Sequence, residues 1–116
     1  MKKLIVANWK CNPATLKEAQ ELFCLLKEDI KNKDIVICPP SIFLSSLICD
    51  DIKFGAQNCF WEEFGAYTGE ISPQMIKSIG CEYVIIGHSE RRTIFNESND
   101  EIRSKIKQAK RAGLVP

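Results

Sequence analysis

Short apolar runs rich in β-branched residues alternate along this chain with stretches in which apolar residues recur at helical spacing. The runs have the length and composition of buried strands, and they span Lys3–Asn8, Asp34–Cys38, Lys53–Gln57 and Glu82–Ile86. Because strands and helices alternate in regular order, the pattern predicts right-handed crossovers and a parallel sheet. The predicted fold class is α/β.

Capping residues mark where the helices begin. Thr15 and Glu18 have the spacing of a capping box, and the apolar residues that follow predict a helix over 16–31. Ser98 and Glu101 repeat this spacing and open a second helix, which ends at Gly113.

Two shorter helices are predicted between these. One follows Pro40. The other begins at Ser72–Pro73, an N-cap followed by a proline at the first helical position, and it ends at Gly80.

The last residues, Leu114–Pro116, resemble the start of a fifth strand. Four parallel strands with helices on one face would also leave an apolar face and two strand edges bare. We therefore expect residues 1–116 to be a single incomplete domain whose open face something else must cover.

Composition narrows the classes of function. The chain has 116 residues, of which 45% are hydrophobic and 27% charged, as in one ordinary globular unit. The net charge of +1 is too small for the basic surface that nucleic-acid binding needs. No signal-peptide core or membrane-spanning run occurs. We expect a cytoplasmic protein with neither nucleic acid nor membrane as partner.

Six cysteines would fit a disulfide framework in a secreted chain. Three of them lie inside apolar runs and are typical of small core residues. A zinc site is disfavoured because the chain has one histidine and no Cys-x-x-Cys motif, so no metal site is predicted.

Polar residues follow three of the predicted strands: Asn8–Lys10, Gln57–Asn58 and Gly87–Arg92. In parallel α/β proteins the carboxyl ends of the strands carry the functional groups. These three groups are therefore expected to meet on one rim.

His88 comes directly after a strand and a glycine, at the start of a helical turn. Backbone N–H groups there disfavour an added proton, which predicts a neutral imidazole that donates a hydrogen bond. A purely structural histidine is the alternative. Lys10 either is a solvated charge or binds an anionic oxygen, and Glu90–Arg92 alone is typical of a solvated charge run.

Four segments resemble triosephosphate isomerases in order and spacing: Asn8–Asn12, Gly55–Asn58, Gly65–Ser72 and Tyr83–Arg92. The likeness covers the whole chain, which corresponds to the first four βα units of a (β/α)8 TIM barrel, with the start of strand five. It implies interconversion of dihydroxyacetone phosphate and D-glyceraldehyde 3-phosphate through an enediolate, in glycolysis and gluconeogenesis, without a cofactor. It also implies a homodimer for the full-length family.

The resemblance assigns roles to individual residues. Lys10 resembles the lysine that binds the substrate phosphate and enediolate charge, and Asn8 its neighbouring oxygen-binding asparagine. His88 resembles the electrophile, a neutral imidazole that polarises the carbonyl. Ser89 and Glu90 resemble the adjacent active-site serine and the glutamate beside the lysine.

A long connection of about fifteen residues precedes the Ser72 helix, and loops of this length are usually functional. Thr68 and Glu70 in this loop resemble residues that family dimers insert into the partner subunit. Cys11 stands where the family usually has a methionine at that interface. A bulky thiol reagent on Cys11 is therefore expected to dissociate or inactivate a dimer.

The family's catalytic glutamate, closing lid and later phosphate loops have no counterpart in these 116 residues. Gln57, Arg91 and Glu97 resemble structural residues, so neither Glu90 nor Glu97 is assigned as the base. We expect negligible activity from the chain alone.

Three interpretations stay open. The chain is a segment of a full-length enzyme, or it is a short half-barrel that assembles with a C-terminal half or with itself and acts as a structural or phosphate-binding module. The third is a flavodoxin-like domain of unrelated function.

Overall fold

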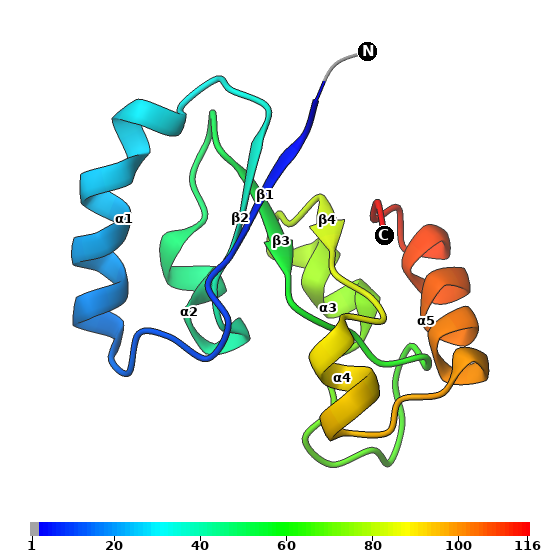
Figure 1. The fold of residues 1–116 in the computed structure, drawn as a ribbon. Helices are drawn as coiled ribbons and strands as arrows, with labels where there is room; N and C mark the ends of the chain where they lie inside the picture. Colours follow the sequence, from blue (N-terminus) through cyan, green and yellow to red (C-terminus); the bar gives the residue numbers. More distant parts are fainter. Residues whose placement is uncertain (1–2) are drawn as a thin grey trace.

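A computed structural model describes residues 3–116 and contains one parallel sheet (Figure 1). Its strands, in spatial order, are β1 (Ile5–Asn8), β2 (Ile35–Cys38), β3 (Lys53–Ala56) and β4 (Tyr83–Val84). All neighbouring pairs are parallel. The α/β prediction is confirmed. The sequential order also differs from the flavodoxin-like order, in which the second strand precedes the first, so that alternative is wrong.

The helices are α1 (Leu16–Ile30), α2 (Ser41–Leu47), α3 (Pro73–Ser78), α4 (Ser89–Ile94) and α5 (Asn99–Arg111). Both predicted capping boxes form, with Thr15 Oγ1 accepting from the Glu18 N–H at 3.2 Å and Ser98 Oγ accepting from the Glu101 N–H at 3.2 Å. The sequence predicted only a helical turn after His88, and the structure extends that turn into α4.

The fourth strand is shorter than the predicted Glu82–Ile86, because little chain lies beside its outer edge. A bridge to Val115 begins a fifth parallel strand there. The Val84 N–H donates to the Val115 carbonyl at 3.0 Å, and the Val115 N–H donates to the Glu82 carbonyl at 2.8 Å. The predicted start of strand five is thus confirmed.

The core lies between the sheet and the helices that surround its outer side in Figure 1. Its members include three strand residues, Ile37, Phe54 and Val84, and three helix residues, Phe23, Leu44 and Ile76. At the start of β1 two apolar side chains remain uncovered, with Ile5 and Val6 at 59% and 47% exposed, and Leu4 just before the strand is 45% exposed. The β1 edge is therefore bare, as predicted, whereas the β4 edge, which was also expected to be bare, carries the bridge to Val115.

Substitution of Gly55 is predicted to be destabilising because Gly55 leaves no room for a side chain. An added Cβ would lie 2.9 Å from Cys38 Sγ and 3.1 Å from Tyr83 Cβ. Gly55→Ala should lower the free energy of unfolding by about 1–3 kcal/mol, measured by urea denaturation. Adding Cys38→Ala should recover part of that loss. An unchanged stability for Gly55→Ala would show that β2 and β4 leave room for a side chain at this position.

The six cysteines are free thiols and fall into two equal groups. The exposed ones are Cys11, Cys24 and Cys49, and the buried ones are Cys38, Cys59 and Cys81. Burial raises the pKa of Cys38 to about 12 and the pKa of both Cys59 and Cys81 to about 11.

Thiol titration should separate these groups, because only exposed thiolates react readily. An aromatic disulfide reagent at pH 8 is expected to label three thiols of the folded 116-residue chain within minutes and the other three after denaturant is added. Peptide mapping identifies which thiols react. Fast native labelling of Cys38 or Cys81 would show that the sheet opens more easily than its burial implies.

Candidate active site

The segment that follows β1 is held against the ends of β2 and β3. Lys10 has a left-handed backbone with φ of 60°, and its N–H donates to Asn8 Oδ1 at 2.9 Å. Gln57 Nε2 donates to the carbonyls of Lys10, at 2.8 Å, and Cys38, at 2.9 Å. These bonds fix the direction in which the Lys10 side chain leaves the rim.

His88 is placed by the reversal between β4 and α4. Gly87 turns the chain with φ of 68°, and His88 is the N-cap of α4. Its ring nitrogen Nδ1 accepts a hydrogen bond from the Glu90 N–H at 3.2 Å. An accepting Nδ1 carries no proton, so in the neutral ring Nε2 is the N–H donor.

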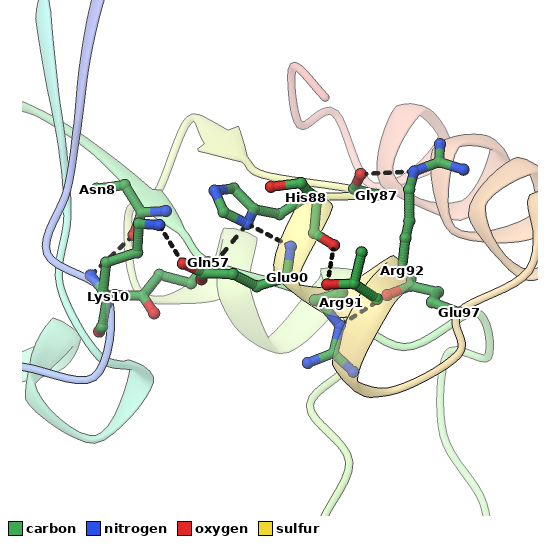
Figure 2. A network of polar contacts seen from close by, with 11 residues as sticks. Asn8, Lys10, Gln57, Gly87, His88, Glu90, Arg91, Arg92 and Glu97 are labelled. Atoms are coloured by element: carbon green, nitrogen blue, oxygen red, sulfur yellow. Dashed lines mark hydrogen bonds and ion pairs between the residues drawn. The ribbon is translucent and has the colours of Figure 1, made fainter.

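Glu90 joins Lys10 to His88 (Figure 2). Its Oε1 forms an ion pair with Lys10 Nζ, and its Oε2 lies 3.5 Å from His88 Nδ1. The Glu90 N–H, at 3.2 Å, is nearer to Nδ1 than the Glu90 carboxylate is, so the contact between ring and carboxylate does not require a proton on Nδ1. The hydrogen bond from Lys10 lowers the pKa of Glu90, which makes this carboxylate a poor proton acceptor.

The rim therefore brings together the residues predicted from three strands. Asn8, Lys10, His88 and Glu90 lie within one chain of contacts, and Ser89 is exposed at the first position of α4. A cation and a ring N–H at one rim can stabilise negative charge on a substrate oxygen.

A buried ionic network lies behind α4. Glu97 Oε2 is 2.7 Å from Arg91 Nε, and Glu97 Oε1 is 2.9 Å from Lys105 Nζ. Lys105 also donates to Asn58 Oδ1 at 2.9 Å. The Glu97 and Lys105 side chains are only 4% and 5% exposed. Burial raises the pKa of Glu97, but the ammonium and guanidinium groups outweigh it and lower the pKa overall.

The residues predicted at a dimer interface are all exposed. Cys11 lies between β1 and α1, whereas Thr68 and Glu70 lie in the loop before α3. That loop is held together by a ring contact of 4.7 Å between Phe60 and Tyr67. Contact of these residues with a second subunit stays a prediction.

Sequence reasoning missed Arg92, which it assigned to a solvated charge run. Its Nε donates to the Gly87 carbonyl at 2.9 Å, and one terminal nitrogen donates to Asn99 Oδ1 at 2.7 Å. The only signal in the sequence was that Arg92 follows His88 by four residues. This spacing does not indicate that the side chain turns back to bind the Gly87 carbonyl.

In the described part of the chain, residues 3–116, no three His, Cys, Asp or Glu side chains are grouped as metal ligands. None of its helices is both long and apolar enough to cross a membrane.

Sequential parallel βα units with their polar groups at the strand ends define the class of βα-barrel enzymes. The sequence profile of the family described as triosephosphate isomerase matches residues 3–116. The chain belongs to the triosephosphate isomerase family.

Curated relatives support this assignment. Triosephosphate isomerase from Dictyoglomus thermophilum is 51% identical over 99% of this chain and 49% of its own length. The enzyme from Aquifex aeolicus is 46% identical over 100% of this chain and 49% of its own. The one from Clostridium botulinum strain Loch Maree is 47% identical, with shares of 97% and 48%. The chain thus spans about half the length of the curated relatives it matches.

Proposed function

We propose that this chain supplies the charge-stabilising half of a triosephosphate isomerase site. The substrate is a phosphorylated triose, which is interconverted between dihydroxyacetone phosphate and D-glyceraldehyde 3-phosphate. Lys10 and His88 carry the catalytic roles, and Asn8, Ser89 and Glu90 line the substrate-binding rim. The full-length protein works as a homodimer with Cys11, Thr68 and Glu70 at its interface.

One observation carries the proposal: Lys10 and His88 lie on one rim and are linked through Glu90. When the substrate loses its carbon-bound proton, negative charge develops on the carbonyl oxygen. The Lys10 ammonium neutralises this charge, and the Nε2–H of His88 donates to it. The imidazole then passes protons between the two substrate oxygens. Lys10 leaves Glu90 for the substrate in this step.

The base that removes the carbon-bound proton is proposed to lie outside residues 1–116. Glu90 lies beside His88 and Glu97 lies behind α4, and both carboxylates are paired with cations. Those cations lower both pKa values and weaken both groups as bases. We therefore expect the chain alone to have no measurable isomerase activity.

Closure of a barrel by two copies of this chain has less support than assembly with a C-terminal half. The exposed apolar residues of β1 favour some association, as an open strand edge does. However, the start of strand five occupies the outer edge of β4. A second copy would have to displace Val115 before its own β1 could pair there. A C-terminal half that continues strand five meets no such obstacle.

The test is a hybrid barrel, in which residues 1–116 replace the matching half of the Dictyoglomus thermophilum relative. Isomerase activity is measured with dihydroxyacetone phosphate and glyceraldehyde 3-phosphate for the hybrid and for the 116-residue chain alone. We expect turnover by the hybrid, none by the chain, and a loss of about 10²–10³-fold in kcat for Lys10→Met in the hybrid.

Circular dichroism and size-exclusion chromatography show whether each protein is folded. A folded hybrid without activity would overturn the proposed function. Turnover by the purified chain alone would overturn the assignment of the base to a separate segment.

A further inference from the structure

The Gly87 carbonyl lies where β4 has ended and α4 has not begun, so neither element supplies it with a partner. The guanidinium of Arg92 does so, with Nε donating at 2.9 Å. The backbone N–H of Arg92 also donates to the next carbonyl, that of His88, at 3.2 Å. Arg92 therefore holds both peptide carbonyls around the histidine.

The guanidinium is fixed from its other side by α5. One terminal nitrogen donates to Asn99 Oδ1 at 2.7 Å, and Asn99 is the first residue of that helix. A Cβ added at Gly87 would lie 3.1 Å from the other terminal nitrogen of Arg92 and 3.0 Å from Ile102 Cδ1. Gly87 is thus enclosed by two side chains that depend on α5. Arg92 is anchored by Asn99 of that helix, and Ile102 belongs to the helix.

We propose that Arg92 is a positioning residue for His88, acting through the Gly87 carbonyl. The inference rests on the proposed function. In Figure 2, Arg92 extends from α4 on the side away from Lys10 and Glu90, so it does not share the rim that would bind substrate. Its effect on the reaction passes through the peptide that carries the imidazole.

The physical basis is the freedom of glycine. Gly87 has a positive φ that glycine adopts without strain, and it has no Cβ to resist rotation. Without the Arg92 guanidinium, the Gly87 carbonyl can only accept a hydrogen bond from water, and the Gly87–His88 peptide is free to rotate. The Nε2–H would then sample directions away from the developing oxyanion. Misplacement of a catalytic group by about 1 Å costs about 10²-fold in rate.

The experiment uses the hybrid barrel with Arg92→Met. We expect kcat to fall about 10- to 100-fold while KM stays within about twofold, because Arg92 orients an electrophile and does not bind substrate. Arg92→Lys keeps the positive charge and one donor nitrogen but not the planar fork that reaches both Gly87 and Asn99, so an intermediate kcat is expected. Asn99→Ala should lower kcat less than Arg92→Met, and Asn99→Asp should preserve it.

Arg103→Met is the matched control, since Arg103 is an exposed arginine of α5 paired with Asp100. Its kcat should equal that of the parent hybrid. A second readout is the ¹⁵N spectrum of the His88 imidazole. We expect an unprotonated Nδ1 signal for the parent and a broadened or shifted Nδ1 signal for Arg92→Met.

The outcomes separate the two proposals. If the folded parent hybrid is inactive, the proposed function fails. The positioning role is refuted if the parent is active and the folded Arg92→Met variant has the kcat of the parent. It is also refuted if that variant loses activity only through a higher KM. If Arg92→Met does not fold, Asn99→Ala and Arg92→Lys decide, and parent-like kcat in both would overturn the role.

Discussion

Replacing His88 with glutamine in the hybrid barrel is expected to lower kcat by about 10²–10⁴-fold, the usual contribution of a positioned acid–base group. Glutamine retains an N–H donor of similar reach but cannot exchange a proton with a substrate oxygen. The variant therefore removes proton transfer while it leaves a hydrogen bond to the carbonyl. KM should change much less than kcat, because the Lys10 ammonium remains in place.

Steady-state kinetics in both directions measure this effect, and exchange of solvent deuterium into substrate separates the steps. Removal of the carbon-bound proton should still be detectable in His88→Gln, whereas transfer between the two oxygens should limit turnover. Lys107→Gln, which alters an exposed residue of α5, serves as a control expected to behave like the parent. A His88→Gln enzyme with parental kcat would show that the histidine is structural.

The predictable parts of this molecule are those that local rules govern. The capping boxes at Thr15 and Ser98 place two helix starts because hydroxyl and carboxylate side chains satisfy N–H groups within three residues. The rim was predictable for a related reason. Carboxyl ends of parallel strands meet at one edge, so Asn8 and His88 converge whatever lies between them in sequence.

The parts that escaped prediction depend on partners that the surrounding sequence pattern does not identify. Lys105 lies in a charged helix and resembles a solvent-exposed residue, yet it is buried because Glu97 and Asn58 meet it inside. Arg92 is of the same kind, since its partner carbonyl belongs to a turn whose geometry requires Gly87. Pattern alone assigns such residues to the surface.

The network around Glu97 should be the most sensitive structural feature of the chain. Glu97→Gln leaves the buried Lys105 ammonium without its counter-charge, and breaking a buried pair in this way costs about 3–5 kcal/mol. Urea denaturation of the hybrid barrel measures the loss. Asp100→Asn, which breaks the exposed pair with Arg103, should cost less than about 1 kcal/mol.

A double substitution and a pH series make the Glu97 prediction sharper. Glu97→Gln combined with Lys105→Met removes both charges and should recover most of the lost stability. The pKa of Glu97 is lowered in the folded state, so its contribution is complete above the ordinary carboxyl value of 4.5 and is lost as the pH falls through the lowered folded value. The stability difference between the parent and Glu97→Gln should therefore be constant near neutral pH and shrink in acid. A difference that grows on acidification would mean that Glu97 is protonated in the folded protein, and that the cations around it do not outweigh its burial.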